Sequence, residues 1–277
     1  MEKDQLWKNM KGRKMIGQKN NIKTLIKWRC NKSVPRFIII SGAQGSGRLT
    51  LAKVIIKMIN AKGIIMGNSI AEVRETIENA YAITEPTCYI FRNADDMKNE
   101  AKNALLKVVE EPPNNAYFIM TVQNIDNMLG TIRSRGPVIR MEPYSKLELE
   151  SYCHDDLLLN YCNNIGQLQI DRKDVEVAEK CVNDVIQALI DKSGTRLLKS
   201  CTQLKGKKTE TNKIDCLLFM RIFEKTLYHN MCNDYIFSES AVQSISECKN
   251  ELCRTTINKK SSIETMLVKL LEDIKCN

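Results

Sequence analysis

The chain has 277 residues, 43% of them hydrophobic and 27% charged, and a net charge of +9. This composition is that of an ordinary globular protein of one to three domains, and no apolar run approaches the roughly 20 residues that span a bilayer. The polar, lysine-rich beginning is unlike a signal peptide, so we expect a cytoplasmic protein without a membrane partner.

The positive charge is spread thinly except in residues 1–30, where lysine and arginine outnumber Glu2 and Asp4. Contact with nucleic acid is one explanation and an abundance of lysine is the other; we favour the second for most positions. None of the eleven cysteines forms a C-x-x-C pair, so we expect reduced thiols and no zinc. His154 and His229 belong to no recognisable catalytic arrangement.

The first motif is a phosphate-binding loop. A strand-like run, residues 37–41, leads into Gly42-Ala43-Gln44-Gly45-Ser46-Gly47-Arg48-Leu49-Thr50 and an expected helix over residues 51–61. Glycines let the backbone wrap phosphates, and the helix N-terminus favours an anion. Two positions depart from the pattern: Arg48 stands at the lysine position, and Leu49 stands where a hydroxyl would bind magnesium. Thr50 has a hydroxyl, but it lies one position after the one that the motif requires.

The next elements alternate between helices and strands. We expect Lys62-Gly63 to end the helix, with Gly63 in a left-handed conformation, and Ser69 to Glu72 to form a capping box. Residues 88–91 and 117–122 are predicted to be buried strands. Between them, apolar residues at helical spacing predict a helix from Met97 to Val108, with Lys98, Lys102 and Lys107 facing water. Pro112 and Pro113 should end it.

After a short strand at residues 138–141, a second capping box from Ser145 to Glu148 begins a helical region. From about Asp174 the pattern is helical, interrupted by a basic loop from Leu204 to Lys213 that we expect to be solvated. The alternating part, up to about residue 142, predicts an α/β fold whose parallel sheet has helices on both faces, followed by an all-helical part.

The stretch from Cys88 to Arg135 carries a resemblance to a known family. Ala94-Asp95, the helix ending in NALLKVVEEPP, the strand YFIMTV and the segment TIRSRG resemble the AAA+ clamp loaders of bacterial replication, and within that family the delta-prime subunits of DNA polymerase III. Ile16-Gly17-Gln18 and the closing helix with Ile263, Met266, Leu267, Leu270 and Leu271 extend the resemblance more weakly. It implies an AAA+ core (1–142), a helical lid (143–187) and a C-terminal helical collar (188–277).

The resemblance also implies a damaged nucleotide site. Arg92 and Asn93 stand where active members have two carboxylates, which hold magnesium and activate water. Gln123 stands at sensor 1, and Gln167 replaces the arginine of sensor 2. The losses at Leu49, Arg92 and Asn93 together predict that the chain does not hydrolyse ATP by itself. Gly42, Gly45, Gly47, Arg48 and Thr50 would still allow ATP or ADP to bind without hydrolysis, although no cofactor is required. We expect Asp95 and Asp96 to serve the start of the following helix.

Arg135 is the candidate catalytic residue. In the resembling family, the arginine of Ser-Arg-Cys reaches the nucleotide of a neighbouring subunit, where it stabilises the transferring phosphoryl group; here Gly136 replaces the cysteine. The alternative is a surface arginine paired with a carboxylate. The implied partners are gamma/tau-like motor and delta-like subunits, with a sliding clamp and primer–template DNA reached through the assembly. Two other functions stay open: a gamma/tau-type motor with a variant ATP site, and an inert AAA+ DNA-binding scaffold.

Overall fold

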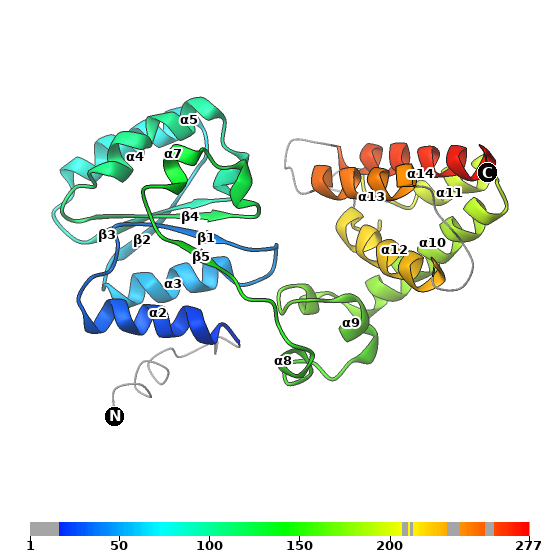
Figure 1. The fold of residues 1–277 in the computed structure, drawn as a ribbon, viewed down its shortest axis with the longest axis horizontal. Helices are drawn as coiled ribbons and strands as arrows, with labels where there is room; N and C mark the ends of the chain where they lie inside the picture. Colours follow the sequence, from blue (N-terminus) through cyan, green and yellow to red (C-terminus); the bar gives the residue numbers. More distant parts are fainter. Residues whose placement is uncertain (1–16, 207–209, 211–212, 232–238, 253–257, 277) are drawn as a thin grey trace. The chain divides into compact units, whose positions relative to one another are not determined.

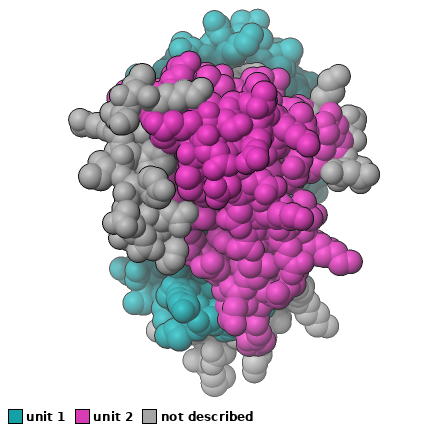
Figure 2. Space-filling view, turned by 90° about the vertical axis from the view of Figure 1, so that its right-hand side faces the viewer, with its two compact units in different colours: residues 1–152, 163–167 teal, residues 153–162, 168–277 magenta. Residues whose placement is uncertain are grey.

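The computed structural model describes residues 17–206, 210, 213–231, 239–252 and 258–276. The described residues fall into two compact units, shown in Figures 1 and 2. The first extends to Tyr152 and includes Asn163–Gln167; the second comprises Cys153–Cys162 and the chain from Leu168 onward. The predicted boundary between lid and collar, at residues 187 and 188, stays a prediction.

The first unit contains a five-stranded parallel sheet with strand order β2-β3-β4-β1-β5. Four of its strands were expected from the sequence, at residues 37–41, 88–91, 117–122 and 138–141, and the structure confirms them with shifts of at most one residue at an end. The strands are β1 (Phe37–Ser41), β2 (Lys62–Met66), β3 (Thr87–Arg92), β4 (Ala116–Val122) and β5 (Val138–Arg140).

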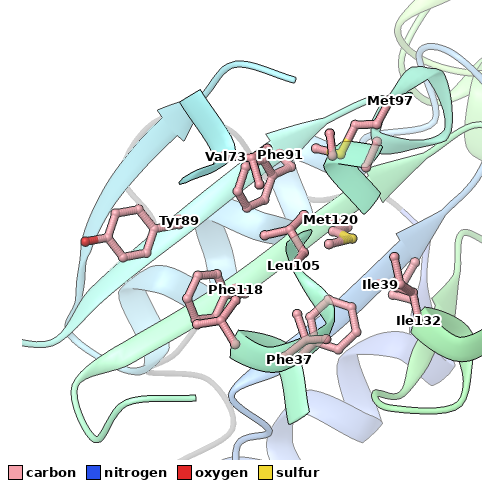
Figure 3. Packing of buried hydrophobic residues seen from close by; sticks show 14 of the residues in the cluster. Phe37, Ile39, Val73, Tyr89, Phe91, Met97, Leu105, Phe118, Met120 and Ile132 are labelled. Atoms are coloured by element: carbon pink, nitrogen blue, oxygen red, sulfur yellow. The ribbon is translucent and has the colours of Figure 1, made fainter. Parts of the chain in front are cut away.

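Helices cover both faces of this sheet, as the sequence predicts. Because side chains alternate along a strand, Phe37 and Ile39 of β1 face one apolar cluster while Ile38 and Ile40 face the other. The first cluster, part of which Figure 3 shows, lies under four helices: α4 (Ile70–Ala82), α5 (Asn99–Ala104), α6 (Leu106–Glu110) and α7 (Gly130–Arg133). The second cluster lies under α2 (Lys19–Cys30) and α3 (Arg48–Met58).

Both predicted capping boxes are present. Ser69 accepts the Glu72 N–H while the Glu72 carboxylate accepts the Ser69 N–H, and Ser145 and Glu148 do the same at the start of α8 (Lys146–Glu150). These reciprocal bonds satisfy N–H groups that a helix start would otherwise leave unpaired.

Three local predictions are wrong. The residue with positive φ after α3 is Asn60, not Gly63, because Lys62 and Gly63 already pair with β3 as part of β2. The helix expected from Met97 to Val108 is broken into α5 and α6 around Leu105. Lys102 was expected to face water, but it is 4% exposed, and its ammonium donates to two backbone carbonyls.

The second unit is helical, as predicted, among the residues that the structure describes. It contains α9 (Asp156–Tyr161), α10 (Arg172–Ile190), α11 (Gly194–Cys201), α12 (Cys216–Met231), α13 (Glu239–Leu252) and α14 (Lys259–Cys276). Part of the expected basic loop from Leu204 to Lys213 lies outside the described residues. No helix in the described part of the chain is long and apolar enough to cross a membrane.

Candidate functional site at the phosphate-binding loop

The glycine-rich loop connects β1 to α3, as its sequence predicts. Gly45 and Gly47 have φ of 85° and 94°, a region that glycine enters without steric cost, and Gly47 is the N-cap of α3. The Gly42 N–H donates to the Val122 carbonyl at 3.1 Å. A Cβ at Gly42 would come within 2.7 Å of the Met141 side chain, so this position also requires glycine. The loop therefore has the backbone of an anion-binding turn.

Arg48 is the first residue of α3 and is 9% exposed. One Nη donates to the Asn93 Oδ1 at 3.3 Å, which joins the loop to the end of β3. Burial lowers the pKa of Arg48, and the nearby charge of Asp95 opposes that shift. A guanidinium in this position keeps a positive charge beside the loop.

Leu49 lies at the position where the sequence motif predicts a magnesium-binding hydroxyl. Leu49 is half-buried and packs against the apolar cluster under α2 and α3, so its side chain belongs to the core. Thr50, whose hydroxyl comes one position late, is half-buried in the first turn of α3.

The end of β3 also lacks the two carboxylates. Arg92 is exposed, and Asn93 has φ of 50°, a left-handed conformation that asparagine adopts more readily than most residues. The Asn93 N–H donates to the Thr121 hydroxyl at 3.2 Å, and Asn68 donates to the carbonyls of both Arg92 and Asn93. Asn93 thus shapes the turn after β3.

Asp95 has a role that the sequence did not reveal. It lies in the 3₁₀ helix η1 (Ala94–Asp96), before α5, and its Oδ2 accepts the N–H groups of Gln123 and Asn124 at 3.0 and 3.1 Å. Its carboxylate therefore connects the ends of β3 and β4 and fixes the backbone of Gln123, the residue expected at sensor 1. The expectation that it serves the start of the next helix is wrong.

The segment Asn163–Gln167, here named the strap, lies directly on the phosphate-binding loop. Asn164 is 5% exposed and donates through Nδ2 to the Gln44 carbonyl at 3.0 Å, and the Gly166 N–H donates to the Gly45 carbonyl at 3.1 Å. A Cβ at Gly166 would come within 2.4 Å of the Gly45 Cα. Gln167, at the sensor 2 position, accepts the Asn163 N–H at 2.8 Å. The assignment of Gln167 to sensor 2 stays a prediction, and the contacts of the strap with the loop were not predicted from the sequence.

The donors at this site fit an anion better than a metal. The Ser46 hydroxyl and one Nη of Arg48 are buried, with no hydrogen-bond partner in the described part of the protein. Hydroxyl and guanidinium groups both donate hydrogen bonds to phosphate oxygens. Magnesium prefers oxygen ligands, and Leu49, Arg92 and Asn93 provide no carboxylate or hydroxyl. Among the described residues, no cluster of three or more His, Cys, Asp or Glu side chains could hold a metal ion.

Arg135 lies just after α7, and its side chain is 28% exposed. Its Nε and Nη2 donate to the Glu110 carboxylate, with Nε at 2.6 Å, and its Nη1 donates to the Thr131 carbonyl. The arginine is thus paired within its own chain, through a carboxylate that is itself 46% exposed.

The described cysteines are free thiols. Burial raises the pKa of Cys88, Cys181 and Cys248 to about 12, so these thiols stay protonated near neutral pH and behave as small apolar side chains.

Comparison with known proteins finds similarity over part of the chain. Residues 59–145 match the family model described as DNA polymerase III, delta subunit. A DNA polymerase III subunit gamma from Buchnera aphidicola (subspecies Schizaphis graminum) is 26% identical over 160 residues, covering 47% of this chain and 44% of that protein. The chain spans less than half the length of this relative.

Two solved structures from Thermotoga maritima have a similar fold. A DNA polymerase III gamma subunit-related protein has a TM-score of 0.51 at 14% identity, covering 90% of this chain and 99% of the other. The RuvB Holliday junction branch migration motor has a TM-score of 0.50 at 12% identity, covering 92% and 88%. These likenesses confirm the expected fold, a parallel sheet with helices on both faces followed by a helical region.

Proposed function

We infer that the chain is a member of the clamp-loader AAA+ family, to which the DNA polymerase III delta subunit belongs, and we propose that it is a clamp-loader subunit that does not hydrolyse ATP by itself. One observation supports the absence of ATP hydrolysis. The three positions where hydrolysis needs magnesium ligands and a general base hold Leu49, Arg92 and Asn93. Leucine and arginine cannot bind magnesium, and the Asn93 amide accepts a hydrogen bond from Arg48 and cannot take a proton near pH 7.

A delta-prime-like role fits a subunit that lacks ATP hydrolysis of its own but has an arginine that can act on the nucleotide of an adjacent subunit. Arg135 lies in the segment TIRSRG, is partly exposed, and would act on nucleotide held by an adjacent gamma/tau-like motor. A delta-like subunit, a sliding clamp and primer–template DNA complete the proposed assembly, which would work in the cytoplasm. Its phosphate-binding loop would serve as a fixed structural element, or hold ATP or ADP without turnover.

A second candidate, a gamma/tau-type motor with a variant ATP site, is favoured by the names of the curated relatives. The matched proteins of Buchnera aphidicola and Bacillus subtilis are called subunit gamma and subunit tau. ATP turnover by the isolated chain separates this candidate from the first.

We expect the purified chain to release phosphate from ATP at the background rate, with or without primed DNA. The matched variant is Gly47→Ala, because a φ of 94° disfavours alanine and would disrupt any working phosphate-binding loop. Turnover that disappears in Gly47→Ala would identify a motor and overturn the proposal. Turnover that persists unchanged in the variant would come from a contaminant and leave the chain without activity, as expected.

A further inference from the structure

The charged side chains of the first unit are divided unequally between its elements. From residue 5 to residue 71 every charged side chain is a lysine or an arginine, and the next carboxylate is Glu72. The described part of this stretch forms α2, β1, α3 and β2. Because α2 and α3 cover one face of the sheet, that face receives almost no carboxylates. Most of the unit's carboxylates follow in α4 and the later elements.

The exposed lysines of α2 form a regular stripe. Lys19, Lys23 and Lys27 are exposed and four residues apart, so they follow one side of the helix in steps of about 6 Å. Lys53 and Lys57 are exposed at the same spacing on α3. Leu25 of α2 and Ile55 of α3 are buried in the same cluster against the sheet. These five lysines, together with the exposed Arg29, are named the basic face.

No ion pair with a described residue neutralises the basic face. The charge of the Glu148 carboxylate interacts with Lys19, at the start of α2. Glu148 is held mainly by Ser145, whose hydrogen bonds are the largest cause of its lowered pKa, and Lys19 is a smaller cause. Like charges four residues apart on a helix destabilise it, and uncompensated positive charge attracts a polyanion.

We propose that the basic face binds the phosphate backbone of duplex DNA, without reading its sequence. A membrane-surface helix exposes large apolar side chains to the lipid. None of the exposed large apolar residues belongs to α2 or α3. Single-stranded nucleic acid is held by stacking on exposed aromatic rings. Trp28 of α2, in contrast, packs half-buried against the core. Lysine alone on a rigid helical surface suits the evenly spaced phosphates of a duplex. The proposed function includes DNA in the assembly but gives this chain no DNA contact of its own, so the basic face goes beyond it, and its test needs no partner subunit.

The test measures binding of a fluorescently labelled duplex by the full-length chain, as anisotropy over a series of salt concentrations. The variant Lys19→Gln/Lys23→Gln/Lys27→Gln should weaken binding ~10-fold or more and lower the salt slope by about 3, since each lost phosphate contact removes about 0.9 from it. A second variant, Lys53→Gln/Lys57→Gln, should lower the slope by about 2. The matched control, Arg74→Gln/Lys98→Gln/Lys107→Gln, removes three exposed charges from the opposite face and should bind nearly as well as the unmodified chain.

Four outcomes would overturn the proposal. Equal losses in the control would show that only net charge matters, and unchanged binding in both basic-face variants would show that another surface is used. If the basic-face variants lost more binding to phosphatidylcholine–phosphatidylserine vesicles than to duplex DNA, the partner would be a membrane. If they lost more binding to polyglutamate than to duplex DNA, the partner would be an acidic protein. Circular dichroism melts of every variant verify that it is folded, as expected for exposed substitutions.

Discussion

Arg135 is held by contacts that are easily exchanged. Its partners are the Glu110 carboxylate and the Thr131 carbonyl, and both members of the ion pair are partly exposed. Exposed pairs of this kind contribute about 0–1 kcal/mol, because water screens them. A triphosphate presented by a neighbouring subunit carries more charge than one carboxylate. It could therefore take the guanidinium at little cost to the stability of this chain.

We predict that Arg135→Ala changes the free energy of unfolding by no more than about 1 kcal/mol. The same variant should lower the ATPase rate of the reconstituted assembly by about 10³-fold or more, because arginines in this role contribute about 10³–10⁵ to the rate. Arg135→Lys should rescue little, because an ammonium lacks the planar fork. Arg133→Ala is the matched control, since Arg133 is also exposed and pairs with Asp126 at 3.0 Å. Full ATPase activity with Arg135→Ala, or the same loss with Arg133→Ala, would show that Arg135 has no such role.

Lys102 fixes the backbone beside the site. Its ammonium donates to the carbonyls of Asp95 and Asn127 at 3.0 and 2.8 Å, and so joins η1 to the 3₁₀ helix η2 (Ile125–Asn127). Burial lowers its pKa, while the charges of Asp95 and Asp96 oppose the shift. The ammonium of Lys102 therefore loses its proton at a lower pH in the folded chain than in the unfolded chain. As a result, the contribution of Lys102 to the free energy of unfolding rises as pH increases toward 10.5.

We predict that Lys102→Met lowers the free energy of unfolding by about 1–3 kcal/mol, because the two hydrogen bonds from the buried ammonium that join η1 to η2 are lost. The loss relative to the unmodified chain should grow as pH rises toward 10.5, since methionine has no proton to release. Urea unfolding at several pH values measures both effects. Lys107→Met, at an exposed position of α6, should be nearly neutral. An equal and pH-independent loss in both variants would contradict the role given to Lys102.

At the scale of elements, the strap is packed on the phosphate-binding loop and bonded to its backbone. Its Gly166 touches Gly45 so closely that an added Cβ would lie 2.4 Å from the Cα and 2.6 Å from the carbonyl oxygen. Both are backbone atoms, which cannot rotate away as a flexible side chain could. A larger residue at position 166 must therefore push the strap off the loop and break the bond from the Gly166 N–H to the Gly45 carbonyl.

We predict that Gly166→Ala lowers stability by about 1–3 kcal/mol, as overpacking does, and lowers the melting temperature by several degrees. Amide exchange at Gln44 to Gly47 should become faster. Gly130→Ala is the control, because no atom lies within 4 Å of the added Cβ. Equal stability and exchange in the two variants would mean that the strap does not hold the loop.

The sequence predicted the elements whose own residues determine them. β1, β3 and β4 are continuous apolar runs, and both capping boxes are local motifs. β2 was missed because it lies at the edge of the sheet with exposed Lys62 and Gly63, so only its pairing with β3 makes it a strand. At the site, the loop and its departures were predicted. The strap and the Asp95 contacts depend on residues 28 to 121 positions apart, which local patterns cannot predict.

At the scale of the whole molecule, the helical unit has a core of its own. α10, α11, α12 and α13 all contact α14. The closing-helix residues Ile263, Met266, Leu267 and Leu270 are almost fully buried among them. These side chains, which the resemblance assigned to a collar, are therefore occupied within their own chain. Any collar contact made by α14 would use its exposed side, where Val268 is 39% exposed.

We predict that deleting residues 258–277 unfolds the helical unit and leaves the sheet unit folded. The deletion removes five buried apolar side chains, each contributing about 1.5–3 kcal/mol, which together approach the entire stability of a typical domain. Limited proteolysis should then leave a protected fragment ending near Tyr152, and association with partner subunits should be lost. Val268→Glu is the control that separates folding from assembly. It should leave the melting curve unchanged, because its side chain is exposed, yet weaken co-purification with partner subunits if α14 contributes to a collar. A truncated chain that resists protease along its remaining length would show that the helical unit does not depend on α14.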